Sequence, residues 1–239
     1  MGNRTIFHGK RVLEYDNFFK TNFGKKVFNL EKEILLKVLD KKDSILEVGC
    51  GTGIWLETLK REGFKKLYGV DISQDMLKLA KKKGLKNLVL GNAEDLPFKE
   101  DSFDTTVFIT SLEFIDDKKK AFLEAVRVSR ESVIVAFLNK LSILSLYRRV
   151  YSLFRDSYYN QIEFLTLEKV DRLRKYAREI LRDKVIIKHS TYSTLNFAFN
   201  GFVNEKLEKV VGLKSPFGTF TVIKFTIKSR HGAGKRYTC

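Results

Sequence analysis

A glycine-rich turn constrains the fold of this chain more than any other feature. The stretch ILEVGCGTGIW, residues 45–55, places Gly49, Gly51 and Gly53 directly after a run of aliphatic residues. Bare backbone at the junction of a strand and a helix lets a ligand approach closely, and the first amides of the helix then point at it. The sequence therefore predicts a ligand-binding turn at this place.

Hydrophobic periodicity places the turn in an alternating series of strands and helices. Strands are predicted at 44–48, 66–72, 87–93, 103–109 and 132–139, and helices at 27–39, 54–61, 73–84 and 117–129. Ser73 is a suitable N-cap for the third of these helices and Gly84 a suitable stop. Strands rich in Val, Ile and Leu between such helices predict an α/β fold with a parallel sheet covered on both faces.

The pattern changes after residue 140. Residues 141–154 form an amphipathic, aromatic stretch, and residues 166–183 predict a strongly polar helix. Residues 185–193 and 218–229 read as strands, and the second has the clearest alternation of β-branched and aromatic residues in the chain. These two late strands are candidates for an antiparallel pair at the edge of the sheet.

The spacing of the glycines argues against a nicotinamide dinucleotide. Dinucleotide-binding turns follow G-x-G-x-x-G, which requires glycine at position 54, where this chain has Ile54. Glu47 also stands two residues before the first glycine. A carboxylate there would repel a pyrophosphate, but it suits a ligand that carries positive charge.

The E-x-G-x-G-x-G arrangement resembles motif I of the class I S-adenosylmethionine-dependent methyltransferases. GVDIS at 69–73 follows in order, and GNAEDLPFKEDSFDTTVFITSLEFIDD at 91–117 resembles the signature of the type 11, ubiquinone/menaquinone methyltransferase-like group. The resemblance covers about residues 15–139, because YDNFFKTNFGKKVFNLEKE at 15–33 also looks like the N-terminal cap of the family.

The resemblance implies S-adenosylmethionine as cofactor and a Rossmann-like sheet in the order 3-2-1-4-5-7-6, with strand 7 antiparallel. Asp71 would hold the two ribose hydroxyls, since a carboxylate accepts two hydrogen bonds from a diol. Asn92 stands where the family usually has Asp, and its amide oxygen still accepts from the adenine amino group. The residues expected to bind the cofactor are Glu47, Gly49, Cys50, Gly51, Gly53, Asp71, Ile72, Asn92, Ala93, Glu94 and Thr110.

The whole chain, 1–239, is predicted to form one methyltransferase domain. Its expected parts are an N-terminal cap (1–40), a cofactor-binding core (41–139), substrate-cover insertions (140–183 and 194–216), the last two strands (184–193 and 217–229) and a flexible tail (230–239).

Methyl transfer from a sulfonium is an in-line displacement, so alignment and exclusion of water matter more than a catalytic triad. A general base is optional, and the candidates for catalytic groups are Glu113 and Tyr15. Surface or structural roles are favoured for His8, His189 and His231. Cys50 and Cys239 are too few for a disulfide framework or a cysteine zinc site. No metal is therefore expected, and the chain suits a reducing cytoplasm.

Motifs that are missing from the sequence reduce the range of possible methyl acceptors. No Asp/Asn-Pro-Pro-aromatic motif follows the fourth strand, so amino methylation of DNA bases is disfavoured. A small molecule, a lipid or quinone, and a tRNA base modified at oxygen remain. The favoured reading is a small, lipid- or quinone-like acceptor, and the alternative is a tRNA methyltransferase. A cofactor-binding regulator without catalysis is a further alternative.

Two features bear on the partner. The net charge of +16 is uneven, with +4 over residues 1–139 and +12 over residues 140–239, and a basic C-terminal half suits an anionic partner or a lysine-rich solvated surface. The apolar face of 141–154 predicts a packing or lid helix, or one that contacts a membrane surface or an apolar substrate tail. No apolar run is long enough to span a membrane.

Overall fold

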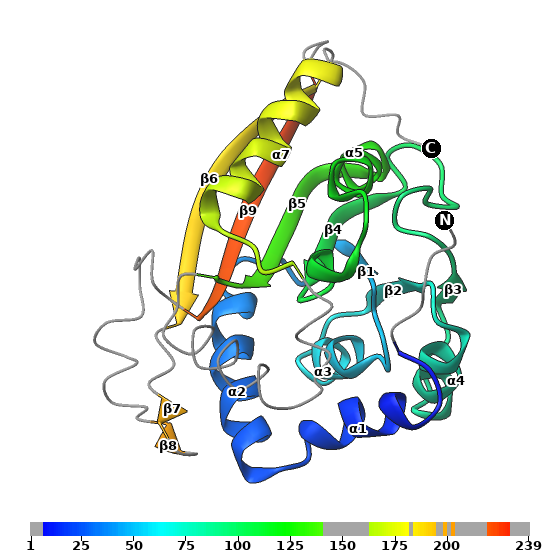
Figure 1. Cartoon of the computed structure of the whole chain (residues 1–239). Helices are drawn as coiled ribbons and strands as arrows, with labels where there is room; N and C mark the ends of the chain where they lie inside the picture. The colour runs from blue at the N-terminus through cyan, green and yellow to red at the C-terminus, as the bar shows by residue number, and fades with distance from the viewer. Residues whose placement is uncertain are drawn as a thin grey trace.

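A mixed sheet with helices on both faces forms the centre of the computed structural model (Figure 1), which confirms the predicted α/β, Rossmann-like class. The structure describes residues 7–140, 163–181, 184–194, 198–199, 202–203 and 219–229. The strands of the main sheet lie in the order β3-β2-β1-β4-β5-β9-β6. They are β1 (Ser44–Val48), β2 (Lys66–Asp71), β3 (Leu88–Leu90), β4 (Phe103–Ile109), β5 (Ser129–Leu138), β6 (Lys184–Thr194) and β9 (Phe220–Ser229).

Strand direction divides the sheet into two parts. The pairs β2–β3, β1–β2, β1–β4 and β4–β5 are parallel, whereas β9 runs antiparallel to both β5 and β6. The predicted antiparallel pairing of the two late strands is therefore confirmed. The short strands β7 (Ala198–Phe199) and β8 (Phe202–Val203) form a separate antiparallel pair.

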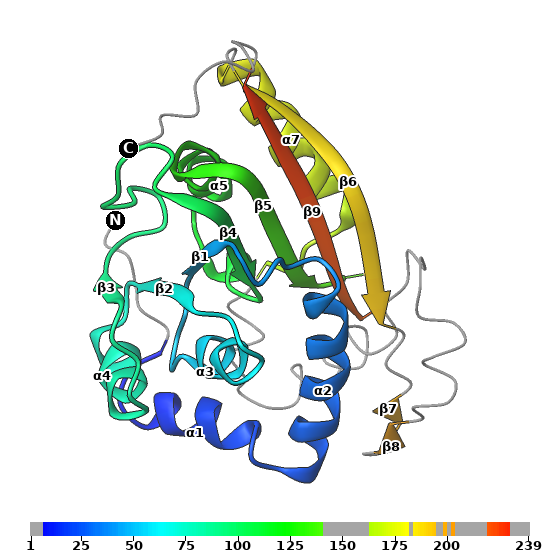
Figure 2. The same ribbon diagram turned by 180° about the vertical axis from the view of Figure 1, so that it is seen from behind.

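Helices cover both faces of the sheet (Figure 2). They are α1 (Lys10–Phe18), α2 (Asn22–Leu36), α3 (Ile54–Arg61), α4 (Gln74–Lys82), α5 (Lys118–Val128), α7 (Leu167–Ile180) and the 3₁₀ turn η1 (Leu112–Phe114). One core cluster joins α5 and α7 to the sheet through residues such as Phe122 and Val170. The other joins α2 and α3 to the opposite face through residues such as Leu35 and Trp55.

Most of the predicted elements lie within one or two residues of the predicted bounds, but several ends differ further for local reasons. The helix predicted at 27–39 spans Asn22–Leu36, because the Thr21 hydroxyl accepts from the Gly24 amide and caps it. The strand predicted from 132 begins at Ser129, whose hydroxyl donates to the Ala125 carbonyl and pairs with the Thr106 hydroxyl, each at 2.6 Å. The strand predicted at 87–93 is only Leu88–Leu90. The amphipathic stretch 141–154 and the tail 230–239 lie outside the described residues.

The N-terminal helix α1 runs across the end of the molecule where α3 and α4 lie, as Figures 1 and 2 both show. Sequence patterning did not predict this helix, because it is short and mostly polar and its N-cap, Gly9, has no side chain to cap it. Within the described residues, no helix is long and apolar enough to cross a bilayer.

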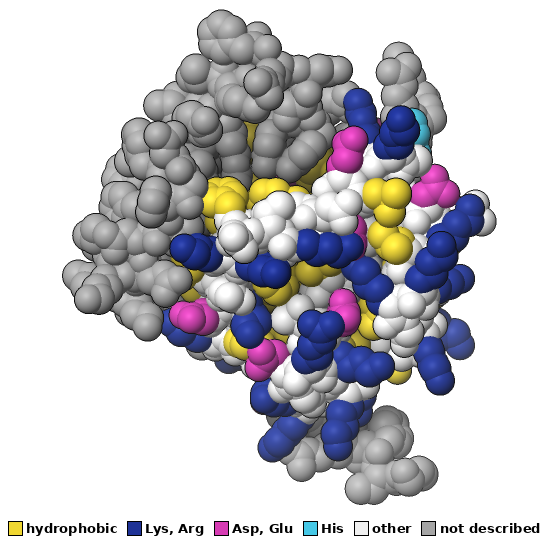
Figure 3. All heavy atoms as spheres, turned by 90° about the horizontal axis from the view of Figure 1, so that it is seen from below, with side chains coloured by type: hydrophobic (Ala, Val, Ile, Leu, Met, Phe, Trp, Pro, Cys, Tyr) yellow, Lys and Arg dark blue, Asp and Glu magenta, His cyan; other side chains and the backbone are white. Residues whose placement is uncertain are grey.

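Cationic side chains dominate the face seen from below (Figure 3). Exposed lysines and arginines of the helices α1 to α4 and the loop after α1 include Lys10, Arg11, Lys20, Lys25, Lys26, Lys60, Arg61, Lys78, Lys81 and Lys82. Exposed acids are few between residues 7 and 86, chiefly Glu14, Glu33 and Asp40, whereas Asp16, Glu31 and Glu47 are buried. The charge of this half is therefore segregated, with cations outside and acids inside.

Candidate functional site: a glycine turn under an N-terminal helix

The glycine turn leaves β1 and enters α3 with a backbone that only glycine adopts easily. Gly49, Gly51 and Gly53 have φ angles of 73°, 53° and 74°. A Cβ added at Gly49 would lie 2.5 Å from the Ser111 Cβ, and one added at Gly53 would lie 2.2 Å from Leu85 Cδ1. Side chains are therefore excluded at both ends of the turn by strain and by close packing.

Asp71, at the end of β2, holds the turn in place. Its Oδ2 accepts from the Gly51 amide at 2.7 Å, and its Oδ1 accepts from the Ser73 amide at 2.8 Å. The amides of Gly49 and Cys50 both donate to the Val70 carbonyl, at 2.8 and 3.0 Å. Burial raises the pKa of Asp71, although the amide hydrogen bonds oppose the rise. The carboxylate expected to face the cofactor thus also positions the turn.

Glu47 is a buried acid with an unsatisfied oxygen. The residue is 2% exposed, and its Oε2 has no hydrogen-bond partner. Burial, and then the charge of Asp71, raise the pKa of Glu47 well above its usual range. A buried carboxyl oxygen without a hydrogen-bond partner, beside a second acid, costs folding free energy unless a ligand supplies positive charge or hydrogen-bond donors. The site therefore fits S-adenosylmethionine, which carries a sulfonium and an amino group, and does not fit a pyrophosphate.

The other predicted cofactor residues gather at the same edge of the sheet, where β1, β2 and β3 end. Ile72 is 40% exposed, as a side chain that packs on a planar ring would be. Asn92 Oδ1 accepts from the Glu94 amide at 3.0 Å, and Glu94 Oε1 accepts from the Asp117 amide at 3.0 Å. Ala93 is partly buried against the core. The structure thus brings together the residues predicted to bind adenine, in a loop that is hydrogen-bonded to the start of α5.

Cys50 and Thr110 contribute backbone to this region. The Cys50 side chain is 4% exposed and packs into the core beside Leu56 and Leu77, so its thiol faces inward. Thr110, directly after β4, has a φ of 49°, and its amide donates to the Ala136 carbonyl at 2.7 Å. A non-glycine residue with this backbone is held there by its surroundings, a feature that concentrates at functional sites.

Glu113 lies in η1, after β4, with one oxygen satisfied and one not. The residue is 2% exposed, its Oε1 accepts from the Leu138 amide at 2.8 Å, and its Oε2 has no partner. Burial raises the pKa of Glu113 to about 7, against the opposing effects of the amide hydrogen bonds and Lys118. The carboxyl can therefore take up or release a proton near neutral pH.

Tyr15 reaches the site from α1. Its Cε1 lies 3.9 Å from the position that a Gly51 Cβ would occupy. Burial, followed by the charges of Glu47, Glu31, Asp71 and Asp16, raises the pKa of Tyr15. The phenol is therefore neutral at ordinary pH, which makes it a hydrogen-bond donor instead of a base.

Aromatic rings connect Tyr15 to Glu113. The Phe7 ring centroid lies 5.3 Å from that of Tyr15 and 5.4 Å from that of Phe114, both in edge-on geometry. Tyr15 also packs edge-on against Phe19 at 5.2 Å. We call Phe7, Tyr15, Phe19 and Phe114 the aromatic wall; it extends from the glycine turn to the loop that holds Glu113.

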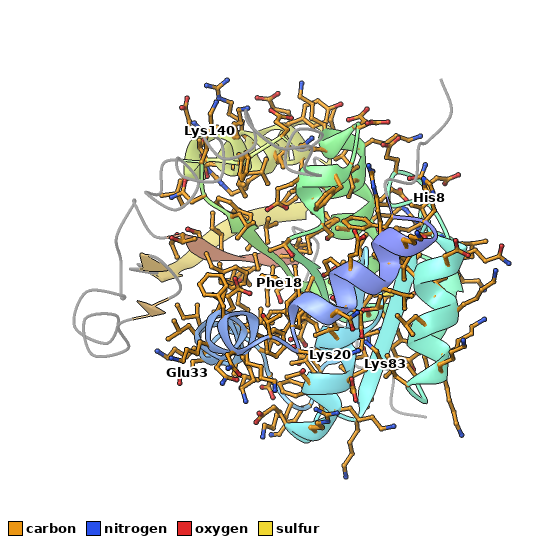
Figure 4. The ribbon with its side chains drawn as sticks, turned by 60° about the horizontal axis from the view of Figure 1, so that its bottom comes forward. His8, Phe18, Lys20, Glu33, Lys83 and Lys140 are labelled. Carbon is orange, nitrogen blue, oxygen red and sulfur yellow. The ribbon has the colours of Figure 1, made fainter. Side chains whose placement is uncertain are left out.

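The histidines lie apart from this arrangement or outside the described residues. His8 is exposed and lies at the outer edge of the molecule (Figure 4). His231 and the side chain of His189 lie outside the described residues. In the part of the chain that is described, no three His, Cys, Asp or Glu side chains cluster in a way that could hold a metal ion.

Sequence reasoning missed the acidic residues that the cap buries. Asp16 is 4% exposed and Glu31 is 7% exposed. The available signal for Asp16 was its spacing from Val12, since residues four apart share a helix face and both are buried on α1. That signal only becomes useful once α1 is recognised as a helix.

A Rossmann-like sheet with a glycine turn, a buried acid before the turn and an acid after the second strand defines a nucleoside-binding α/β enzyme. Residues 46–137 match the model of a methyltransferase domain of type 11. The chain belongs to the class I S-adenosylmethionine-dependent methyltransferases, type 11 group, and its cofactor is S-adenosylmethionine.

Individual relatives support this assignment. An uncharacterised protein of Methanocaldococcus jannaschii is 33% identical over 169 residues, covering 70% of this chain and 77% of the relative. A demethylmenaquinone methyltransferase of Geobacillus stearothermophilus is 31% identical over 135 residues, covering 52% of this chain and 57% of the relative. The chain spans about half the length of several other curated relatives.

A solved structure extends the likeness beyond the cofactor-binding core. It is the crystal structure of an S-adenosylmethionine-dependent methyltransferase of Thermotoga maritima, described as a possible histamine N-methyltransferase. The TM-score is 0.73 at 25% identity, with 92% of this chain and 97% of that chain covered. The similarity therefore extends over most of the chain and not only over the cofactor-binding core.

Proposed function

We propose that this methyltransferase acts on a small, lipid- or quinone-like acceptor held beside the aromatic wall. The observation that carries the proposal is the position of that wall between the glycine turn and Glu113. Aromatic side chains provide large apolar surface and favour flat or apolar ligands. The likeness to demethylmenaquinone methyltransferases supports the same class of acceptor.

Each cofactor contact is likewise our proposal. Asp71 holds the ribose hydroxyls, Asn92 with the backbone of Ala93 and Glu94 holds the adenine, and Ile72 packs on its ring. Glu47 stabilises the positively charged end of the cofactor. The division of the chain into cap, core and cover follows the same scheme, with the cap and core boundary near residue 40.

The cofactor supplies an activated methyl group, so the protein has to align the acceptor and exclude water. The aromatic wall does both, because it removes water from one side of the turn and presents an apolar surface. Tyr15 donates a hydrogen bond across this space. Glu113 receives the proton from an acceptor hydroxyl, a role that a carboxyl with a pKa near 7 can perform at neutral pH.

Methyl transfer from tritiated S-adenosylmethionine tests this proposal. We expect label in a reduced naphthoquinone presented in detergent micelles, and none in bulk tRNA. Phe114→Leu should lower kcat/KM for the quinol about tenfold, or ~1.4 kcal/mol, since it removes part of the apolar contact. Phe98→Leu is the matched control, because Phe98 packs against Phe103 and outside the wall.

Two results would reverse the assignment of the acceptor. Label in tRNA and none in any apolar acceptor would favour the RNA alternative. Equal effects of the two phenylalanine substitutions would remove the aromatic wall from the acceptor site.

A further inference from the structure

Asp16 forms a buried polar cluster that joins three separate parts of the chain. The residue lies on α1 and is 4% exposed. Its Oδ1 accepts from the hydroxyl of Thr52, at 2.9 Å, and from the ammonium group of Lys83. Thr52 is fully buried in the middle of the glycine turn, and Lys83 is the C-cap residue directly after α4. The cluster therefore links the cap helix to the turn and to α4.

A second cation completes the cluster. Lys20 Nζ lies 3.0 Å from Asp16 Oδ2, and Lys83 Nζ lies 3.4 Å from Thr52 Oγ1. Figure 4 shows Lys20 and Lys83 close to each other beside α1. Burial alone would raise the pKa of Asp16, but hydrogen bonds from Lys83, Lys20 and Thr52 outweigh it and lower the pKa. Asp16 is therefore ionised, and both of its oxygens are used.

Two other polar contacts join the N-terminal segment to the core, one between neutral groups and one that is exposed. The Ser73 hydroxyl donates to the Phe7 carbonyl at 2.7 Å, and the Gly9 amide donates to Asp75 Oδ2 at 3.3 Å. The Asp75 side chain is 44% exposed, so water competes for it. Asp16 is thus the buried, charged attachment of α1 to the glycine turn.

The position next to Asp16 gives the cluster a consequence for ligand exchange. Tyr15 precedes Asp16 on α1 and lies over Gly51, so a shift of α1 that separates Asp16 from Thr52 also moves Tyr15 away from the turn. A ligand seated on that turn lies beneath α1. A movement of α1 away from the core therefore uncovers the turn on the side where Tyr15 lies.

We propose that Asp16 is a positioning residue, which with Thr52 and Lys83 latches α1 over the cofactor and limits the rate of cofactor exchange. The inference rests on the proposed placement of the cofactor at the glycine turn. It adds a role for the cap that the methyl-transfer chemistry does not require. Opening consists of breaking the hydrogen bonds from Thr52 and Lys83, with no covalent change.

Stopped-flow measurement of S-adenosylhomocysteine release from the full chain tests the latch. The single tryptophan, Trp55, lies in α3 directly after the turn and provides the fluorescence signal. Asp16→Asn should accelerate release at least tenfold and raise KM for S-adenosylmethionine, while kcat changes less than threefold. Lys83→Met should act in the same direction. The double variant Asp16→Asn/Lys83→Met should release the ligand little faster than either single variant, because each single change already breaks the same ion pair between Asp16 and Lys83.

Matched variants separate a latch from a general loss of structure. Glu14→Gln removes an acid from the exposed side of the same helix and should leave the release rate unchanged. Lys83→Arg keeps the charge and should retain slow release. If Asp16→Asn does not fold, Thr52→Val removes only the hydroxyl and should still accelerate release about threefold.

Release rates within twofold of the wild type in Asp16→Asn, or in both Thr52→Val and Lys83→Met, would overturn the latch. The placement of the cofactor would survive that result, provided that the wild type binds it. Absence of cofactor binding to the wild-type chain would instead remove the proposed function.

Discussion

Three acids characterise the candidate site, of which Glu47 and Glu113 are buried and Asp71 is partly buried. Glu47 and Glu113 each have one buried carboxyl oxygen without a hydrogen-bond partner, whereas both oxygens of Asp71 accept hydrogen bonds from backbone amides. The sequence indicated these three acids through their motif positions: Glu47 two residues before the first glycine, Asp71 at the end of the second strand and Glu113 just after the fourth. In the structure Asp71 also holds the glycine turn, so removal of its carboxylate would also release the turn.

Glu113 gives a pH prediction with a definite sign. Its pKa is about 7 in the folded protein, against an ordinary value of 4.5, so the folded state binds more protons than the unfolded state between these limits. The stability that this group contributes is therefore present below about pH 4.5 and is lost as the pH rises through about 7. Glu113→Gln keeps an oxygen that accepts from the Leu138 amide but does not titrate.

Thermal unfolding of the wild type and Glu113→Gln at several pH values tests this sign. Between about pH 5 and pH 8, the Tm of the wild type should fall relative to that of the variant. Glu14→Gln, an exposed change, should follow the wild type at every pH. Parallel Tm profiles for the wild type and Glu113→Gln would show that the pKa of Glu113 is not raised in the folded protein.

At the scale of the elements, the sequence predicted those that are strongly patterned and missed those that depend on distant partners. β1, α3 and β4 have the predicted bounds, because short runs rich in apolar and β-branched residues and a helical stripe define them. α1 has no comparable pattern. Its buried acid, Asp16, is paired with Lys83, which lies 67 residues away in the sequence. Local periodicity carries no information about such a partner.

The glycine turn yields a prediction based on two matched substitutions. Gly84→Ala and Gly49→Ala both place a side chain at positive φ, 80° and 73°. Gly84 has no atom within 4 Å of an added Cβ, so strain alone should cost about 1–2 kcal/mol of unfolding free energy. Gly49→Ala should cost about 1–3 kcal/mol more, since the Ser111 Cβ lies at 2.5 Å.

Chemical denaturation of the two variants measures this difference. Equal losses of unfolding free energy would mean that the turn relaxes away from Ser111. That result would contradict the inference that the turn packs closely and rigidly against the loop after β4.

At the scale of the whole molecule, the structure separates charges in a way that net charge per segment does not reveal. Residues 1–139 have a nearly balanced composition, yet the helices α1 to α4 expose mainly cations. Glu47 and Asp71, two acids of this segment with raised pKa values, lie at the glycine turn, where we propose that the cationic cofactor binds. Of the twenty basic residues of the C-terminal hundred, ten lie outside the described residues.

Isothermal titration calorimetry of the full chain tests the central claim most directly, namely that the glycine turn with Glu47 and Asp71 binds S-adenosylmethionine. We predict micromolar dissociation constants for S-adenosylmethionine and S-adenosylhomocysteine, about −8 kcal/mol of binding free energy, and no heat with NAD. Asp71→Ala should weaken binding of both by roughly 1.5–3 kcal/mol through loss of charge-assisted hydrogen bonds. Tight binding of NAD together with no binding of S-adenosylmethionine would contradict the account.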